Sequence, residues 1–521
     1  MGRNLVVCCD GTGNIWGNDS DTNVVKLARL LLKNNQQILY YDPGVGTSNS
    51  YPSIGWINQI KSRAIKILGL ALGGGIYENI GQAYGFLVEH YQPGDHVFLF
   101  GFSRGAFTAR CVGGMVNLFG IVQRGAETMI PTLTRIYFQP IEGVGGTGKT
   151  RKEYGEDIRA VFALGGHDAR VHFLGVWDTV STVGGLPGWK KNITSSGTIR
   201  GKHYDHVRHA VAFHEYRFAY APRLFTDDND NQLTPSLQQL WFAGAHSDVG
   251  GSYNEDGLSN CSLKWMVEEA VAKGLQCDSS KIDAIQPNPL GLSHDQVFVQ
   301  PLWALTGLRT RPIPSGAIKH ESLILRERTA PLKPQWKTFG SNPRAIGSVS
   351  AAIMMFIVVD FLGAWACLNG CAREFNMAVL QSFLSHRVDT DVFNTVDSFK
   401  MTIRYAADYF FIVTYTFAIC WLLIYARRAL ADRSGNAKLH NIAHWGSVIP
   451  LWTLISSDIL ENGATIYLLN QEAGARASHL SLPIFLAAFT TIKLLSLAAL
   501  LCFFIWLCGY CLSLRWKKMS G

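Results

Sequence analysis

Short apolar runs alternate with helix-like segments through the first half of the chain. The runs that predict buried strands are residues 5–9, 37–41, 97–100, 171–176 and 237–243. Residues 22–33 carry apolar positions at helical spacing behind an Asp21 or Thr22 N-cap, and residues 76–91 predict another helix. Strands that alternate with helices indicate an α/β fold with a mostly parallel sheet, covered by helices on both faces. Reactive side chains gather at the carboxyl ends of the strands in such a sheet.

Longer apolar stretches dominate the last third of the chain. They lie at about residues 346–368, 409–425, 445–469 and 482–512. Their lengths predict about four transmembrane helices, because a helix needs about 20 apolar residues to cross a bilayer. The third stretch contains Asp458 and Glu461, so either it is partly interfacial or these carboxylates have partners. The alternative is a set of buried helices in a soluble domain.

Charge and cysteine content bear on the location of the protein. Basic residues lie before the first apolar stretch, between the second and third, and after the fourth. The positive-inside rule then predicts a multi-pass membrane protein whose N-terminal domain faces the cytoplasm. Eleven cysteines without a regular disulfide spacing agree with a reducing compartment, and the N-terminus lacks the apolar core of a signal peptide. The net charge of +8 includes no extended basic block, so nucleic acid is not expected as a partner.

The segment that carries the most chemical information is residues 96–110. A buried strand ends there at Gly101, and Ser103 stands between this glycine and Gly105, directly before a helix-forming sequence. A serine between two glycines at a strand-to-helix turn is typical of a nucleophile elbow, in which the turn exposes the hydroxyl above the sheet. The alternative is a structural serine in a tight turn.

A serine nucleophile needs a base and a carboxylate that orients the base. Asp178 and His246 each follow a predicted strand, and the order Ser103, Asp178, His246 is that of the α/β-hydrolases. Asp178 could instead cap a turn, and Asp248 is the rival acid. The rival histidines are His203, His206, His209 and His214.

Acyl transfer also needs backbone donors for the oxyanion. The amide of Arg104, which follows the nucleophile, is the first candidate. The amides of Gly11 and Thr12, in the glycine-rich loop after the first strand, are candidates for the second donor, although this loop could be a plain β-α turn. The predicted chemistry needs no metal and no organic cofactor.

Five ordered blocks carry a resemblance to a known family. They are Asp-Gly-Thr-Gly-Asn from residue 10, Tyr-Asp-Pro-Gly-Val-Gly-Thr from residue 41, Gly-Phe-Ser-Arg-Gly-Ala-Phe-Thr-Ala-Arg from residue 101, Gly-Val-Trp-Asp-Thr-Val from residue 175 and His-Ser-Asp-Val-Gly-Gly-Ser-Tyr from residue 246. With these blocks the chain resembles the phospholipase effectors of type VI secretion and their uncharacterised relatives, which share an α/β-hydrolase catalytic domain. The resemblance implies Ser103 as nucleophile, Asp178 as acid and His246 as base, acting on ester bonds of glycerophospholipids. It names no cognate immunity or secretion partner.

A competing motif runs from Gly143 to Thr150 and fits the P-loop pattern of nucleotide-binding proteins in full. A P-loop needs a buried strand before it and a helix after it, so that backbone amides face the phosphates. The segment before this motif contains Pro140, which argues against a central strand. The other interpretation is a flexible basic loop.

These observations combine into one expected organisation. We expect an α/β-hydrolase-like catalytic domain at residues 1–335 with insertions at about 122–168 and 256–335, a linker at 336–345 and a membrane domain at 346–521. The expected function is that of a membrane-anchored serine esterase or lipase, with membrane lipids as substrate and anchor. The alternatives are a P-loop NTPase and a catalytically silent membrane sensor or assembly module.

Overall fold

The computed structural model describes most of the chain and divides it into two compact units. The described residues are 2–11, 20–44, 75–139, 149–164, 169–180, 204–225, 236–308, 311–329, 342–366, 398–431, 437–469, 488–503 and 505–506. Residues 1–295 and 311–334 form the first unit, here called the sheet unit. Residues 296–310 and 335–521 form the second, the helical unit. We expected residues 296–310 in the catalytic domain, but their contacts group them with the helices.

The sheet unit is built on a parallel sheet, which confirms the predicted α/β fold. Its strands, within the described residues, follow the order β2-β1-β3-β4-β5-β6-β7, and every neighbouring pair is parallel. The bounds are β1 (Asn4–Cys9), β2 (Gln37–Asp42), β3 (His96–Phe102), β4 (Val171–Trp177), β5 (Tyr204–Ala212), β6 (Leu237–Phe242) and β7 (Ile318–Lys319). Strands β5 and β7 are additions to the five strands that the apolar runs predict.

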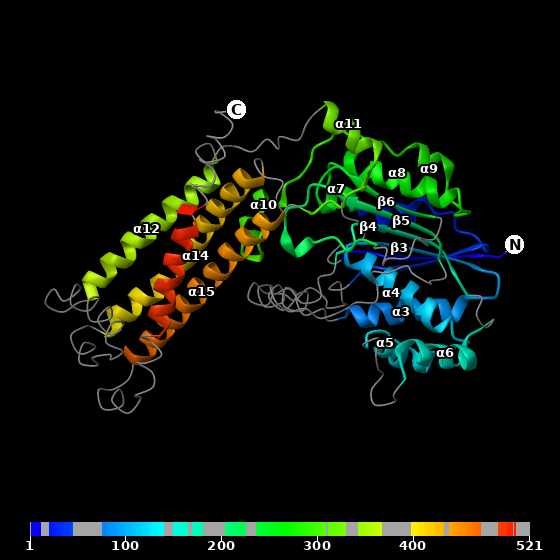
Figure 1. The fold of residues 1–521 in the computed structure, drawn as a ribbon, viewed down its shortest axis with the longest axis horizontal. Coiled ribbons are helices and arrows are strands. Elements are labelled where there is room, and N and C mark those ends of the chain that lie inside the picture. The colour runs from blue at the N-terminus through cyan, green and yellow to red at the C-terminus, as the bar shows by residue number, and fades with distance from the viewer. Residues whose placement is uncertain are drawn as a thin grey trace. The chain divides into compact units, whose positions relative to one another are not determined.

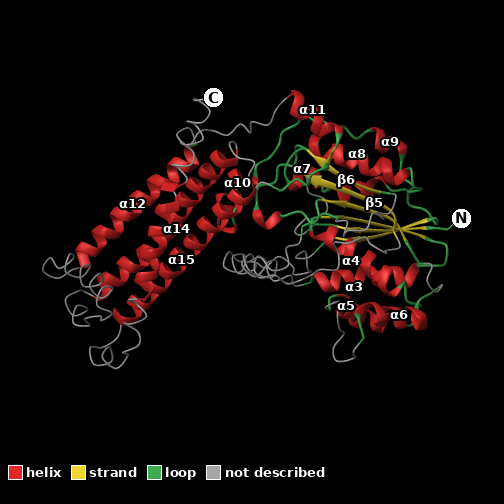
Figure 2. Cartoon of the chain, viewed as in Figure 1, coloured by secondary structure: helices red, strands yellow, loops and turns green. Residues whose placement is uncertain are grey.

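Helices cover both faces of this sheet, as Figures 1 and 2 show. Helices α3 (Ile76–His90) and α4 (Arg104–Phe119) pack on one face, with α5 (Ile130–Tyr137) and α6 (Arg151–Phe162) outside them. Helices α1 (Asn23–Leu30) and α8 (Gly257–Val271) pack on the other face. Strand β1 is therefore apolar from Leu5 to Cys9: Leu5, Val7 and Cys9 enter the first core, while Val6 and Cys8 enter the second.

Several shorter elements complete the sheet unit. They are η1 (Glu127–Met129), η2 (Phe218–Tyr220), α7 (His246–Gly250), α9 (Ser279–Asp283) and α11 (Glu321–Thr329). The register pairs Phe102 with Trp177, and Trp177 with Ala210, so β3 and β4 finish at the same level and β5 ends two residues beyond them. Side chains that follow these strands can therefore meet at one edge of the sheet.

In its described residues, the helical unit contains three long helices: α12 (Pro343–Ala366), α14 (Ser398–Ala431) and α15 (Ala437–Leu469). A further helical stretch, Ala488–Phe503, and the short elements α10 (Gln296–Val299) and η3 (Pro301–Thr306) belong to the same unit. Among the described residues, one segment, Lys400–Tyr425, is long and apolar enough to cross a membrane. Arg344–Val359 and Ala488–Phe503 are apolar but shorter. A region of about four spans thus stays a prediction.

The carboxylates on the third apolar stretch have partners inside this unit. Lys493 Nζ lies 2.6 Å from Asp458 Oδ1 and 3.0 Å from Glu461 Oε2. Tyr415 donates a hydrogen bond of 2.8 Å to Asp458, and Thr490 donates one of 3.0 Å to Glu461. Of the two explanations that the sequence leaves open for these residues, the structure therefore favours pairing.

Candidate active site

Ser103 lies in a strained turn between β3 and α4. Its backbone has φ 60° and ψ −119°, a conformation that non-glycine residues rarely adopt. A Cβ on Gly101 would meet the carbonyl of Gly105, and a Cβ on Gly105 would meet the carbonyls of Cys9 and Asp10 at the end of β1. Both glycines are therefore required by close backbone approaches, as in a nucleophile elbow. The hydroxyl stands at the first turn of α4.

The structure brings the side chains of Ser103, His246 and Asp178 together. His246 Nε2 lies 2.8 Å from Ser103 Oγ, and His246 Nδ1 lies 2.6 Å from Asp178 Oδ2. Asp178 directly follows β4 with φ 39°, and His246 is the first residue of α7, just beyond β6. This arrangement has the connectivity of a Ser-His-Asp triad, in which the carboxylate fixes the tautomer of the imidazole.

A buried arginine holds the carboxylate of this trio. Arg311 Nη1 donates to Asp178 Oδ1 at 2.5 Å, and Arg311 Nη2 donates to Asp178 Oδ2 at 2.8 Å. Burial alone would raise the pKa of Asp178, but the Arg311 charge and the hydrogen bonds from His246 and Arg311 hold that pKa well below its ordinary value. Asp178 is thus ionised at neutral pH.

Two rings and a carboxylate fix the position of His246. The Phe102 ring lies 4.6 Å and the Tyr220 ring 4.9 Å from the imidazole, centroid to centroid. The backbone amide of His246 donates to Glu215 at 3.2 Å, and Arg217 pairs with this glutamate at 2.6 Å. Burial lowers the pKa of His246, although its hydrogen bond to the Asp178 carboxylate opposes this effect. The imidazole is therefore neutral at pH 7, as a general base must be.

Of the three backbone amides expected to bind the oxyanion, the structure describes those of Arg104 and Gly11. Arg104 is the first residue of α4, and the first amides of a helix have no acceptor within the helix. The amide of Gly11 donates to the carboxylate of Asp10 at 2.6 Å, which occupies it. Thr12 lies outside the described residues. The amide of Arg104 is thus the donor that the described geometry offers.

The rival residues have other partners. Asp248 accepts from the backbone amide of Ala245 at the start of α7, and it pairs with His294 at 2.7 Å. His209 contacts Gln239, and His214 accepts from the amide of Gly244; burial lowers the pKa of both imidazoles to about 3. His206 contacts Ser236 at 2.5 Å. His203 lies outside the described residues.

The P-loop alternative lacks its strand. Residues 143–148 lie outside the described residues, but 135–137, where the delivering strand would begin, belong to helix α5. Lys149 pairs with Asp157, and Thr150 caps α6 through a capping box with Glu153. A helix in place of the buried strand, together with a lysine already paired, leaves no support for a phosphate cradle. No group of three His, Cys, Asp or Glu side chains that could hold a metal ion occurs in the described part of the chain.

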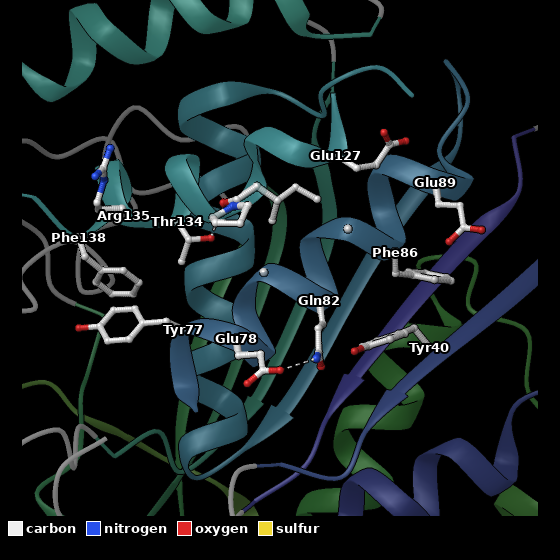
Figure 3. Close-up of a pocket in the computed structure, with 14 residues that line it drawn as sticks. Tyr40, Tyr77, Glu78, Gln82, Phe86, Glu89, Glu127, Thr134, Arg135 and Phe138 are labelled. Carbon is white, nitrogen blue, oxygen red and sulfur yellow. Dashed lines mark hydrogen bonds between the residues drawn. The ribbon is translucent and has the colours of Figure 1, made fainter. Parts of the chain in front are cut away.

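A groove of about 1200 Å³ lies between α3, α5 and β2, and Figure 3 shows its lining. Tyr77 packs edge-on against Phe138 on one side, and Tyr40 stacks on Phe86 on the other. Ser103, Asp178 and His246 do not line this groove.

Sequence reasoning missed Arg311, Glu215 and Arg217. Arg311 is 133 residues from Asp178 along the chain, and no motif surrounds it. Glu215 and Arg217 follow β5, a strand that the apolar pattern did not predict. Recognition of β5 as a strand would have placed both residues at the reactive edge of the sheet.

The chain is similar to known proteins over its first half. Residues 3–269 match the family model described as the type VI secretion system (T6SS) phospholipase effector Tle1-like catalytic domain. The chain belongs to this family. The match includes the sheet unit through most of α8 and ends before Arg311, so the arginine contact to Asp178 lies outside the family's matched region.

Two similar proteins cover only part of the chain. An uncharacterized protein of Saccharomyces cerevisiae, YEL023C, is 30% identical over 247 residues, which is 45% of this chain and 36% of the yeast protein. A solved structure, described as the Tle1 effector bound to the VgrG spike of the T6SS, is 20% identical with a TM-score of 0.23. That match covers 49% of this chain and 52% of the effector. The chain thus spans about half or less of the length of these relatives.

Proposed function

We propose that this protein is a serine esterase that hydrolyses phospholipids, with Ser103 as nucleophile, His246 as base and Asp178 as orienting acid. The observation that carries the proposal is the continuous contact from Ser103 Oγ to His246 Nε2 and from His246 Nδ1 to Asp178 Oδ2. Membership of a phospholipase effector family supports a lipid ester as the substrate.

The proposed reaction has two steps. His246 Nε2 accepts the Ser103 proton while Oγ attacks the ester carbonyl, and the amide of Arg104 donates to the oxyanion. The imidazolium then protonates the leaving lysophospholipid alcohol, and the acyl group stays on Ser103. A water molecule next gives its proton to His246 and attacks this ester, which releases the fatty acid and restores the serine. Asp178 stabilises the imidazolium in both steps.

The side chain of Arg104 supports a substrate with a phosphate group. It is half-buried beside the nucleophile, and no carboxylate in the described residues pairs with it. Burial lowers the pKa of its guanidinium to about 10, so it is still a cation at pH 7. An unpaired guanidinium in a partly desolvated place is a suitable partner for a phosphodiester.

The helical unit supports attachment to a membrane. Lys400–Tyr425 is long and apolar enough to cross a bilayer, and exposed apolar side chains such as Phe356, Ile357 and Phe361 project from α12. We place the sheet unit on the cytoplasmic side of a multi-pass protein, following the basic flanks of the apolar stretches. Carbonate extraction and labelling of introduced surface cysteines in sealed vesicles test this topology. Release by carbonate, or labelling from the opposite side, would contradict it.

A fluorophosphonate probe and lipid profiling test the chemistry. We expect the full-length protein in detergent to be labelled, the Ser103→Ala variant to be unlabelled, and a Ser280→Ala variant, changed at an exposed serine of α9, to be labelled as the wild type. Membranes that contain the wild type should gain lysophospholipids and free fatty acids relative to Ser103→Ala. A folded wild-type protein that never labels would instead identify a catalytically silent module.

A further inference from the structure

We propose that Arg311 is a positioning residue of this site: its guanidinium fixes the Asp178 carboxylate in the orientation that His246 needs and partly neutralises the negative charge of that carboxylate. The inference rests on the proposed serine hydrolase function and adds a residue from outside the family's matched region. Neither the elbow motif nor the order of the triad requires an arginine at the acid.

The contacts at Asp178 are complete only with Arg311. A carboxylate has about four positions that accept hydrogen bonds. Here Oδ1 accepts from the Ala212 amide at 2.9 Å and from Arg311, while Oδ2 accepts from His246 and from Arg311. Without Arg311, half of these contacts would be lost from a side chain that is fully buried. The carboxylate could then rotate away from the imidazole.

Arg311 is itself held in place from two sides. Its side chain is 3% exposed. Nη1 also donates to the carbonyl of Ala212 at 2.7 Å, and Nη2 donates to the carbonyl of Tyr220 at 2.6 Å. These carbonyls belong to the end of β5 and to η2, and the Tyr220 ring contacts His246. The guanidinium thus links Asp178 to Tyr220, the residue whose ring contacts His246. It does so through a planar fork of N–H donors that lysine lacks.

The charge of Arg311 also sets the pH at which the base is free. A carboxylate beside an imidazole favours the imidazolium, and a cation on that same carboxylate weakens this preference. Loss of the cation would make the His246–Asp178 pair take up a proton at higher pH, whichever of the two residues carries it. A protonated pair cannot accept the serine proton. As the pH is lowered, a variant without the Arg311 cation would therefore lose activity at a higher pH than the wild type does.

The position of Arg311 in the chain adds a structural consequence. It is the first residue of the sheet unit after residues 296–310, which pack in the helical unit. Phe298 of that segment contacts Trp421, and Trp452 donates to the carbonyl of Leu305 at 2.8 Å. In the sequence, the residue that binds the Asp178 carboxylate therefore directly follows a segment of the helical unit.

Steady-state kinetics against pH test the inference, with a p-nitrophenyl ester and the full-length protein in detergent. In Arg311→Met we expect kcat to fall about 10- to 100-fold with little change in KM. The acid midpoint of kcat/KM should move up by about one pH unit. In Arg311→Lys, which keeps the charge but not the fork, kcat should fall by at least about tenfold with the midpoint near that of the wild type.

The matched control is Arg326→Met, because Arg326 is also buried and donates to the carbonyls of Pro289 and Gly291, away from the trio. Its acid midpoint should equal that of the wild type, whatever the change in thermal stability. If Arg311→Met lowers activity equally at every pH and leaves the midpoint unmoved, Arg311 is only structural and the inference is wrong. If Arg311→Met fails to fold, an Arg311→Lys variant with unchanged kcat overturns it.

The same experiment separates this inference from the proposed function. Wild-type protein that is labelled by the fluorophosphonate at Ser103, with Arg311 variants that behave as the wild type, would overturn only the role of Arg311. Wild-type protein that is neither labelled nor active would overturn the proposed function itself.

Discussion

The sheet unit and the helical unit bury carboxylates with different degrees of support. Asp178 in the sheet unit is fully buried, and both of its oxygens accept two hydrogen bonds from rigid donors: a backbone amide, an imidazole and a guanidinium fork. Charge and direction are both fixed, which is what an orienting acid requires.

In the helical unit one flexible cation serves two acids. Asp458 and Glu461 lie three residues apart on α15, and Lys493 from the stretch Ala488–Phe503 pairs with both. The lysine side chain is 31% exposed, and each acid gains one further hydrogen bond, from Tyr415 or Thr490. This network joins α14, α15 and the stretch Ala488–Phe503 through these contacts.

The comparison teaches that a buried charge is evidence for chemistry only when its geometry is complete. An ion pair in which one lysine is shared by two carboxylates offsets the cost of burial, but a lysine lacks the planar fork that would orient a carboxylate. A carboxylate that is saturated by fixed donors and directed at an imidazole has a more specific use.

The largest expected effect comes from Asp178→Asn. The amide cannot stabilise an imidazolium, and its NH₂ group would oppose the Arg311 fork, so we expect kcat/KM to fall about 10⁴-fold. Esterase kinetics on the full-length protein measure this. Asp248→Asn, at the rival acid, should lower activity by less than about tenfold, because Asp248 supports α7 and contacts His294. A larger loss of activity in Asp248→Asn than in Asp178→Asn would instead identify Asp248 as the orienting acid.

The second expected effect is on the helical unit. Lys493→Met would leave two buried carboxylates without their cation, and we expect a loss of about 1–3 kcal/mol of stability. Thermal unfolding in detergent measures it, and fluorophosphonate labelling of Ser103 at low temperature should not change. A triple variant that also carries Asp458→Leu and Glu461→Leu should recover most of the stability, since apolar replacement of a whole network is often neutral. No recovery would mean that the network has a role beyond pairing.

The parts of the fold that could be predicted are those whose signal is local. Strand β3 and the Ser103 elbow follow from an apolar run and two glycines, and the N-cap Thr22 was one of two predicted candidates for the start of α1. Strand β5 could not be predicted in this way, because adjacent polar residues, Asp205-His206 and Arg208-His209, interrupt its apolar pattern. Arg208 and His209 are buried there against Glu269 and Gln239, which are distant in the sequence.

The same reason explains the outcome at the site. Ser103 and Asp178 could be proposed because each directly follows a strand that the apolar pattern predicts, and His246 follows another at a short distance. Arg311 could not, because its partners are Asp178 and the carbonyls of Ala212 and Tyr220, all from other parts of the fold. A contact that only tertiary structure creates leaves no periodicity to detect.

A smaller effect is expected at Arg104. Arg104→Met should reduce the ratio of kcat/KM for phosphatidylcholine over that for a neutral diacylglycerol by about tenfold, since one charge-assisted contact to phosphate is lost. Activity on the neutral lipid should stay within about twofold, because the amide of residue 104 is kept. Matched mixed micelles of the two lipids give the ratio. An equal loss on both substrates would show that the guanidinium supports the elbow rather than the phosphate.

The smallest expected effect is the pH response of the wild type near neutrality, and it bears directly on the contrast between the two buried cations, Arg311 and Lys493. Burial lowers the pKa of His246, so the imidazole becomes protonated, and inactive as a base, only as the pH falls below the ordinary histidine range. A histidine with its ordinary pKa of about 6.5 would lose about threefold of its neutral form between pH 7 and pH 6. We therefore expect kcat/KM of the wild type to fall by less than this over the same interval, and kcat/KM of Arg311→Met to fall by more than that of the wild type. If kcat/KM of the wild type fell as steeply between pH 7 and pH 6 as that of Arg311→Met, Arg311 would not tune the protonation of the His246–Asp178 pair. Its role would then be only to pair a buried carboxylate, as Lys493 does in the helical unit.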